Sequence, residues 1–336
     1  MKAPIAIESM ALDDHPGVGA WKELGGGGRA AAVELWREES PTKPAIYRLL
    51  FTDPTHPAVF AKRCIRTSVE LERRVYEMVL PHLPVTTPRC FGFHEEHGGA
   101  GWLFIEDVGT ERFSMRDPEH RALAARWLGL LHRAGADLPA AGRLPDAGPA
   151  RYLGHLRSAR EKIRRSAGNP GLAAEDRAML DGILVSHDAL EARWHDLERA
   201  CEGVPATLVH GDFRPKNVRV RGNGAAPSLY PIDWEMAGWG VPAADLAPAR
   251  GPGLTMQVDL HTYEMVVRAR WPDLHAAAIR RLSIVGHIFR ALAGIEWACE
   301  SLVFESPEEL AKPLSLMPSY LARITQALEA APEWLA

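Results

Sequence analysis

The stretch TLVHGDFRPKNVRVRGNGAAPSLYPIDWE, residues 207–235, decides the fold, because it combines a predicted hairpin with clustered polar side chains. Two short β-type runs, VRV and SLYPI, flank the Gly/Asn-rich turn RGNGAAP, which is the pattern of a β-hairpin. Asn217 precedes the first run and Asp233 follows the second, so antiparallel pairing would set them side by side. Asp212 lies in the tight loop just before. We therefore expect two carboxylates and a carboxamide at one end of this hairpin.

Such a group of oxygen-bearing side chains predicts a chemistry. Mg²⁺ prefers hard oxygen ligands and keeps several waters. One carboxylate can orient a hydroxyl group and take its proton, while the other carboxylate and the amide can hold a metal ion that bridges nucleotide phosphates. A plain hairpin with polar ends is the alternative, but H-G-D-x-x-x-x-N followed by I-D-W is rare by chance. The hairpin therefore predicts Mg²⁺-dependent phosphoryl transfer.

Composition restricts the class of protein. The 336 residues suggest two domains or lobes, and 46% hydrophobic with 24% charged residues is ordinary for a globular chain. The formal net charge of −4 argues against nucleic acid or an anionic membrane as a partner.

The spacing of the cysteines and the length of the apolar segments indicate the cellular compartment of the protein. The four cysteines lie far apart without a C-x-x-C pair, as expected for reduced thiols. The N-terminal residues MKAPIAIESMALDDHPG lack the uninterrupted apolar stretch of a signal peptide. The segment LSIVGHIFRALAGI is too short to span a bilayer and contains His287 and Arg290. We expect a cytoplasmic protein.

The flanking sequence predicts an α+β architecture with two lobes. Upstream of the hairpin, extended runs and turns predict a five-stranded antiparallel sheet with one helix, SVELERRVYEMVL. After Gly109 the patterns become Ala-, Leu- and Arg-rich and helical. We expect a small nucleotide-binding lobe over residues 1–107. Residues 108–336 would form a larger, mainly helical lobe that contains the catalytic loop, the hairpin with its metal site and the acceptor site.

The motifs H-G-D-F-R-P-K-N, I-D-W-E and A-D-L-A closely resemble those of the aminoglycoside phosphotransferase/choline kinase-like family. These proteins are small-molecule kinases with the protein-kinase fold, and the resemblance covers about residues 33–297. It implies a bilobal protein-kinase-like fold, with Asp212 as catalytic base and Asn217 and Asp233 as Mg²⁺ ligands. It also implies that His210 and Asp245 brace the catalytic loop.

The same resemblance assigns residues to the nucleotide. Lys62 stands where the family places its phosphate-binding lysine, and a buried lysine needs an acidic partner. Glu70 and Glu72 lie on opposite faces of the following helix, so only one can point at Lys62. The family pattern of an acid followed by an aromatic residue four positions later, Tyr76, favours Glu72.

Further nucleotide contacts follow from the position of each segment. The run GWLFIEDVG resembles the hinge between lobes, where the backbone around Glu106 would bind adenine and Phe104 and Ile105 would help line its pocket. The loop ESPTKPA joins the first two predicted strands, so Ser40 and Thr42 would contact phosphate oxygens; the tetraglycine at 25–28 matches neither phosphate-loop pattern.

Arg214 occupies the position where protein kinases carry a catalytic-loop lysine. Its guanidinium could steady the transferring phosphoryl group. A solvated loop arginine is the alternative interpretation.

The acceptor site is predicted only in outline. Glu296 and Glu300 lie one helical turn apart with Trp297 beside them, so they could hold a cationic substrate by charge and cation–π contact. A solvated helix face is the alternative. The full set of candidate acceptor residues is Trp234, Glu235, Trp239, His287, Glu296, Trp297 and Glu300.

We therefore predict an enzyme that moves the γ-phosphate of ATP or GTP, with Mg²⁺, to a hydroxyl of a small molecule. Aminoglycosides, macrolides, sugars, nucleosides and amino alcohols all remain candidate acceptors. A catalytically silent pseudokinase that binds nucleotide is the alternative. A protein-substrate kinase is disfavoured, because EMAGWGVPAADLA contains neither an activation-segment phosphosite nor A-P-E.

Overall fold

The structure is a computed structural model that describes residues 5–7, 12, 14–39, 44–96, 99–139, 141–222, 227–247 and 258–331. Its internal contacts divide the chain into two compact units. The first unit comprises Met1–Phe113 and Lys216–Ala237, and the second comprises Ser114–Pro215 and Gly238–Ala336. Each unit is described by itself below.

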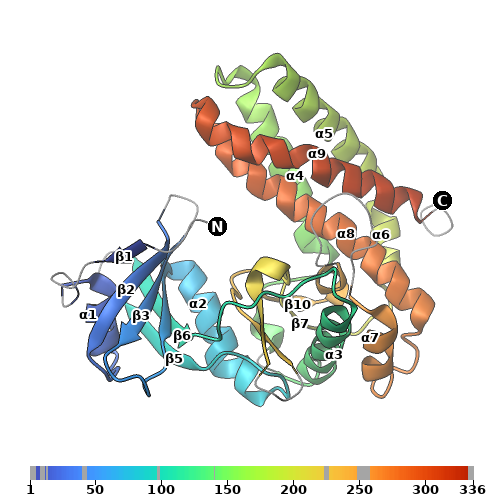
Figure 1. Cartoon of the computed structure of the whole chain (residues 1–336). Helices are drawn as coiled ribbons and strands as arrows, with labels where there is room; N and C mark the ends of the chain where they lie inside the picture. The colour runs from blue at the N-terminus through green and yellow to red at the C-terminus, as the bar shows by residue number, and fades with distance from the viewer. Residues whose placement is uncertain are drawn as a thin grey trace. The chain divides into compact units, whose positions relative to one another are not determined.

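The first unit contains an antiparallel six-stranded sheet in the order β1-β2-β3-β4-β6-β5 (Figure 1). The five predicted strands are confirmed. A sixth strand, β1, adds three residues at the sheet edge; so short a piece carries no readable alternation, and the sequence did not predict it. The strands are β1 (Ile5–Ile7), β2 (Ala30–Arg37), β3 (Ala45–Phe51), β4 (Val59–Ile65), β5 (Cys90–Glu95) and β6 (Ala100–Glu106).

Two helices, not the single predicted one, cover the two faces of this sheet. Helix α1 (Pro16–Glu23) was not predicted; it begins with a proline, and the His15 side chain accepts from the Gly17 N–H. Its Val18 and Trp21 pack with sheet residues such as Trp102 in one buried cluster. Helix α2 (Arg66–Arg74) covers the opposite face, and it continues through the π-helical turn Val75–Val79 and the 3₁₀ turn Leu80–His82.

The predicted hairpin is confirmed as β8 (Val218–Arg221) and β9 (Ser228–Pro231), paired antiparallel. It groups with the first unit, although we expected it in the C-terminal lobe. Hydrogen bonds explain this grouping: the Phe113 N–H donates to Val218 O, and Arg221 Nη1 donates to Glu106 Oε1 at 2.8 Å. The lobe boundary between residues 107 and 108 stays a prediction.

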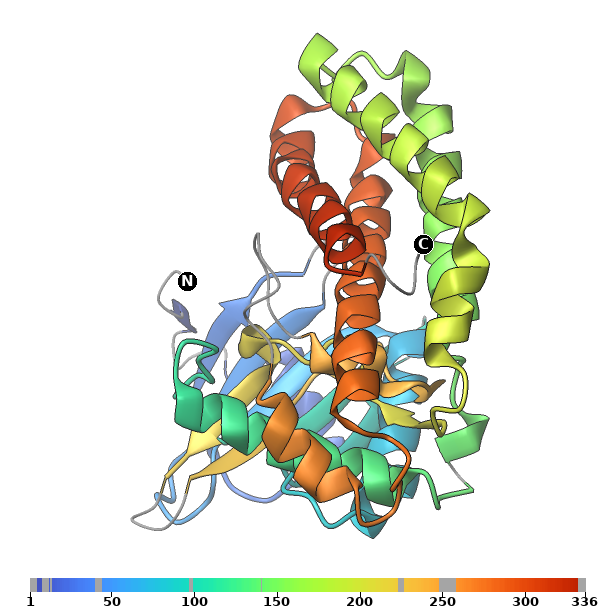
Figure 2. The ribbon, with the colours of Figure 1, turned by 90° about the vertical axis from the view of Figure 1, so that its right-hand side faces the viewer.

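The second unit is mainly helical, and its long helices α4, α5, α8 and α9 are prominent in Figures 1 and 2. A two-stranded pair, β7 (Thr207–Val209) and β10 (Gly238–Gly240), precedes the short 3₁₀ segment η7 (Pro242–Leu246). The helices are α3 (Pro118–Gly135), α4 (Pro149–Arg165), α5 (Ala174–Ala192), α6 (Trp194–Cys201), α7 (Leu260–Val267), α8 (Ala276–Cys299) and α9 (Pro307–Glu329).

Helix α8 is the core helix of this unit. Among the described residues, one segment, Ala276–Val303, is long and apolar enough to cross a membrane, but 72% of its apolar window is buried inside the protein. Gly286 lets α8 approach η7 closely, because a Cβ there would lie 1.9 Å from Ala243 O. Burial against the protein therefore accounts for the apolar character of α8.

The four cysteines carry no disulfide. Three are buried and Cys90 is half-buried. Burial raises the pKa of each thiol to about 12. All four thiols are therefore protonated near neutral pH.

Candidate functional site

The first unit gathers three carboxylates around Lys62. The Lys62 Nζ lies 2.9 Å from Glu72 Oε2, 2.6 Å from Asp233 Oδ1 and 3.3 Å from Glu235 Oε2. These residues come from β4, from α2 and from the loop after β9, so the fold brings together positions up to 173 residues apart. Lys62 and Glu72 are both buried.

Burial and charge act in opposite directions on this cluster. Burial by itself lowers the pKa of Lys62, but Asp233, Glu72 and Glu235 outweigh it and hold that pKa well above its usual value. Burial raises the pKa of Glu72, and Lys62 opposes that shift. Glu72 is further fixed by the Trp234 N–H, which donates to Oε1 at 3.0 Å. The cluster is thus a charged lysine held by one buried acid, Glu72, and by two partly exposed acids, Asp233 and Glu235.

Asn217 and Asp233 flank the hairpin at one end, as the sequence predicted. The Ile232 N–H donates to Asn217 O at 2.8 Å, which joins the two chain segments beside these side chains. Asn217 is buried, and Asp233 has a left-handed backbone with φ of 72°. Such a conformation is uncommon outside glycine, and aspartate is among the residues that tolerate it.

The donor set at this end fits Mg²⁺. A carboxylate and a carboxamide offer hard oxygen atoms, and Mg²⁺ is typically held by one or two carboxylates together with substrate phosphates and waters. Within the described ranges, no group of three or more His, Cys, Asp or Glu side chains could hold a metal by itself. The arrangement thus fits an ion that nucleotide phosphates help to hold.

In the second unit, Asp245 anchors the loop that carries Asp212. Its carboxylate accepts from the His210 N–H at 2.7 Å and from the Gly211 N–H at 2.9 Å. Gly211 has φ of 75°, which a side chain would resist. His132 Nε2 lies 3.2 Å from Asp245 Oδ2. The expected bracing role of Asp245 is thereby confirmed in geometry.

The pKa of the Asp245 carboxyl reflects these partners. Burial by itself raises that pKa, but the hydrogen bond and charge of His132, together with His210, lower it below its usual value. Asp245 is therefore ionised at neutral pH although it is fully buried. His210 adds a second brace, since the Asp212 N–H donates to its Nδ1 at 3.3 Å.

Two guanidinium groups contact the Asp212 carboxylate. Arg214 Nη2 donates to Oδ2, and Arg290 Nη2 lies 2.8 Å from Oδ1. From the sequence we assigned a site role to Arg214 and none to Arg290. The sequence did contain one indication of this contact. Arg290 lies in a largely apolar helical segment, where a charged side chain needs a partner.

The predicted hinge residues Phe104 and Ile105 lie on opposite faces of the sheet. In the β4–β6 ladder Lys62 pairs with Leu103 and Phe60 with Ile105, whereas Phe104 pairs with Ala61. Successive side chains point to opposite faces, so Ile105 shares the face of Lys62 and Phe104 does not. Phe104 packs against Trp21 under α1, with ring centroids 5.4 Å apart. Phe104 can thus offer only its backbone to a nucleotide on the Lys62 face.

Other nucleotide candidates are partly engaged or lie outside the structure. The Glu106 N–H donates to Arg89 O at 2.8 Å, so this group is not available to adenine. Ser40 and Thr42 lie outside the described residues.

The candidate acceptor residues fall into three groups. Trp234 is fully buried beside Glu72 in the first unit, and Glu235 belongs to the Lys62 cluster. His287 is fully buried on α8, and Trp297 is half-buried on the same helix. Trp239 is half-buried on β10, where it pairs with Leu208.

Glu296 and Glu300 make up the third group, and both are ion-paired. Lys162 Nζ lies 2.5 Å from Glu296 Oε1 and 3.4 Å from Glu300 Oε1. Ser158 and His155 also contact Glu296, whose pKa is about 2, because its partners outweigh the effect of burial. The two acids that we expected to attract a cation therefore share one lysine of their own unit.

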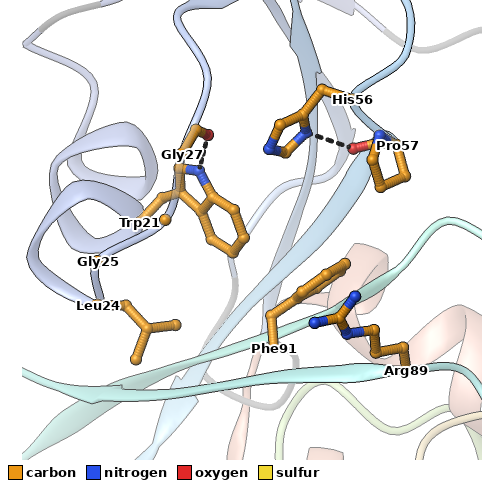
Figure 3. Close-up of a pocket in the computed structure, with 9 residues that line it drawn as sticks. Trp21, Leu24, Gly25, Gly27, His56, Pro57, Arg89 and Phe91 are labelled. Carbon is orange, nitrogen blue, oxygen red and sulfur yellow. Dashed lines mark hydrogen bonds between the residues drawn. The ribbon is translucent and has the colours of Figure 1, made fainter.

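A separate pocket of about 300 Å³ lies on the α1 side of the sheet (Figure 3). Trp21 and Phe91 line it, with ring centroids 5.4 Å apart, and the Arg89 guanidinium lies 5.1 Å from the Phe91 ring. The Trp21 Nε1–H donates to Gly27 O at 2.9 Å, and a Cβ on Gly26 would lie 2.1 Å from the Trp21 ring. The tetraglycine thus packs under Trp21, on the face opposite Lys62.

The fold and the clusters define a class, the small-molecule kinases with a protein-kinase-like fold. A sequence profile of the phosphotransferase enzyme family matches residues 48–279, well over half of the chain. The chain therefore belongs to the phosphotransferase enzyme family. Comparison with curated protein sequences gave no significant match.

Solved structures share the fold at low sequence identity. A microcompartment-associated aminopropanol kinase has a TM-score of 0.60 and 17% identity, with 90% of this chain and 95% of that chain covered. A spectinomycin phosphotransferase in complex with ADP and spectinomycin has a TM-score of 0.60 and 10% identity, covering 90% and 94%. A choline kinase from Cryptosporidium parvum Iowa II has a TM-score of 0.60 and 13% identity, covering 97% and 98%.

Proposed function

We propose that this protein transfers the γ-phosphoryl group of a nucleoside triphosphate, ATP or GTP, to a hydroxyl of a small molecule. The observation that carries the proposal is the Lys62 cluster, which joins one buried lysine to Glu72 and to Asp233 of the I-D-W-E motif. Structural neighbours support a nucleotide co-substrate, since one of them was solved with ADP.

Each residue then has a role. Lys62, held by Glu72, binds phosphate oxygens. Asp212 orients the acceptor hydroxyl and takes its proton as the acceptor oxygen bonds to the γ-phosphorus. The bond from that phosphorus to the β-phosphate oxygen breaks, and the nucleoside diphosphate leaves. Arg214 lies beside Asp212 and can stabilise charge on the transferring group.

Asn217 and Asp233 would hold Mg²⁺. When bound, this ion supplies positive charge that neutralises the phosphate oxygens. Asp233 also contacts Lys62, so one carboxylate would bind the metal ion and lie next to the phosphate-binding lysine. Ile105 and the backbone near Glu106 remain our candidates for the adenine pocket. The cytoplasmic location and the absence of a nucleic-acid or membrane partner remain predictions.

An ATP-consumption assay with Asp212→Ala tests the proposal. Purified wild-type protein should release ADP with Mg²⁺ and at least one acceptor from a panel of aminoglycosides, macrolides, nucleosides, sugars and amino alcohols. Asp212→Ala should lower turnover by about 100-fold or more while leaving nucleotide affinity nearly unchanged, because a positioned base contributes about that much. GTP run in parallel decides the nucleotide.

Two outcomes would contradict the assignment. A near-wild-type rate in Asp212→Ala would remove the catalytic role of that residue. Wild-type protein that is stabilised by Mg·ATP but consumes no ATP with any acceptor would favour the pseudokinase alternative.

A further inference from the structure

Three buried side chains lie behind the loop that carries Asp212, all of them in the second unit. Tyr263 on α7, His132 on α3 and Asp245 in η7 are each fully buried. The Tyr263 hydroxyl oxygen lies 2.9 Å from His132 Nδ1, and His132 Nε2 lies 3.2 Å from Asp245 Oδ2. Asp245 then accepts the two backbone N–H groups that precede Asp212. A continuous chain of hydrogen bonds thus joins α7 to this loop.

The packing around His132 leaves its backbone little freedom. Thr207 Oγ1 on β7 donates to His132 O at 2.6 Å. On the same helix as His132, a Cβ on Gly129 would lie 2.8 Å from the Val266 side chain, so α3 runs close against α7. What the chain of hydrogen bonds still requires is a proton on the correct ring nitrogen.

Tyr263 can decide which ring nitrogen carries that proton. Burial, together with the charge of Asp245, raises the pKa of Tyr263 well above its usual value, so its hydroxyl keeps its proton. Among the described residues, His132 Nδ1 is the one hydrogen-bond partner of this hydroxyl. A buried O–H without an acceptor is costly, so the hydroxyl donates to Nδ1 of the neutral ring. The ring proton then lies on Nε2, facing Asp245.

The opposite placement of the ring proton is unfavourable at both ends. With its proton on Nδ1, the ring would turn an unprotonated Nε2 toward the Asp245 carboxylate, so that two acceptors would face each other. The Tyr263 O–H would also lose its acceptor among the described residues. A charged ring carries Nε2–H as well, so the tautomer with its proton only on Nδ1 is the form that the hydroxyl excludes.

We propose that Tyr263 is a positioning residue for Asp212. Its hydroxyl holds the His132 ring in the form that donates from Nε2 to Asp245, and Asp245 holds the loop that carries Asp212. This inference rests on the proposed function of Asp212. Because the residues proposed to bind the nucleotide lie in the first unit, the effect of Tyr263 should fall on the chemical step and not on nucleotide binding.

Nitrogen NMR of the histidine ring tests the position of the proton directly. Wild-type protein labelled with ¹⁵N-histidine should show His132 with a protonated Nε2, and the spectrum of His132→Gln identifies its signals. In Tyr263→Phe, which removes only the hydroxyl, part of the population should move its proton to Nδ1. Tyr320→Phe, at a buried tyrosine on α9, is the matched control and should keep the wild-type signals. An unprotonated Nε2 in wild type, or unchanged signals in Tyr263→Phe, would overturn the inference.

Kinetics separate positioning from general damage. Tyr263→Phe should lower kcat about fivefold, the effect of losing about one hydrogen bond, with KM for Mg·ATP unchanged. Tyr320→Phe should keep the wild-type kcat. A wild-type kcat in Tyr263→Phe, or a rise in its KM for Mg·ATP at unchanged kcat, would contradict the role.

The two proposals fail separately. If wild type phosphorylates no acceptor in the panel, the proposed function fails, while the NMR spectra still decide whether Tyr263 sets the proton of His132. If wild type is active and the spectra of Tyr263→Phe match those of wild type, the phosphotransferase function stands and the role of Tyr263 is refuted.

Discussion

Asp245 shows how a single side chain sets the shape of the loop that carries Asp212. Its two carboxylate oxygens accept the successive N–H groups of His210 and Gly211 while His132 contacts the same carboxylate. No neutral side chain of the same size can accept both N–H groups, because an asparagine replaces one acceptor with a donor. The loop that carries Asp212 is therefore positioned by a buried charge.

Asp245→Asn should lower the free energy of unfolding by about 3 kcal/mol, the cost of breaking a buried charged network. Urea denaturation measures this change. Asp137→Asn is the matched control: its ion pair with Arg270 is exposed, so its free energy of unfolding should stay close to that of wild type. Equal stability of Asp245→Asn and wild type would show that the network contributes little.

His187 predicts a pH dependence of stability. It is fully buried on α5, and burial, with a further contribution from Arg160, lowers its pKa from 6.5 to about 4. The folded state therefore favours the neutral ring. The resulting stability is fully present above pH 6.5 and is lost as the pH falls from 6.5 through about 4.

Urea denaturation at pH 7 and pH 4.5 should show a loss on the order of 2 kcal/mol that depends on His187. His187→Gln removes the titrating group, so its stability should fall less over this range than that of wild type. His261→Gln, at an exposed position on α7, serves as control and should keep the wild-type slope. An identical slope for His187→Gln and wild type would rule out His187 as the cause.

At the scale of elements, Gly286 allows α8 to approach η7 more closely than any other described glycine of the second unit allows its neighbours to approach. A Cβ on Gly286 would lie 1.9 Å from Ala243 O, and real side chains do not occupy such a position without backbone movement. Since α8 also carries Arg290, a displaced α8 would move the partner of Asp212.

Gly286→Ala should therefore lower the free energy of unfolding by about 2 kcal/mol or more, by overpacking. Gly182→Ala on α5 is the matched control, because no atom lies within 4 Å of its Cβ position. That substitution should be neutral or stabilising by up to about 1 kcal/mol. Thermal unfolding monitored by circular dichroism compares the two, and similar melting temperatures for both variants would contradict the packing argument.

Local patterns explain which elements the sequence could predict. The five longer strands and the hairpin have alternation and turn residues that are visible within one segment. Helix α1 and strand β1 are short and lack such a pattern, so they were not predicted. The grouping of the hairpin with the first unit depends on contacts such as Arg221 to Glu106, which join positions 115 residues apart.

Part of the candidate site could likewise be predicted from local sequence patterns. Lys62, Glu72 and Asp233 follow from motifs, and the structure brings their side chains together. The pairing of Arg290 with Asp212 and of Glu296 with Lys162 could not be derived, because no local pattern shows which distant helix supplies the partner. Phe104 is buried on the sheet face opposite Lys62, and a motif alone cannot show on which face a side chain lies.

At the scale of the whole molecule, ligand binding should appear as added stability. A ligand that binds only the folded state stabilises it by about 2.7 kcal/mol when its concentration is 100 times its Kd. Mg·ATP should thus raise the melting temperature of wild type, and removing Mg²⁺ with EDTA should reduce that shift.

Asp233→Ala should shrink the shift for Mg·ATP more than the shift for ATP with EDTA, since it removes a proposed metal ligand. Glu77→Ala is the control, because Glu77 is exposed and paired with Arg73 on the surface of the same unit. Differential scanning fluorimetry of wild type and both variants gives these shifts. An equal loss of both shifts in Asp233→Ala would refute the metal role.

The chemistry of the native thiols has a practical consequence. Because each of the four cysteines has a pKa of about 12, none offers an appreciable thiolate to maleimide or iodoacetamide at pH 7. A reporter cysteine introduced at an exposed position of either unit would then react alone. Fluorescent or spin labels can be attached to the wild-type background, without first removing side chains from its interior.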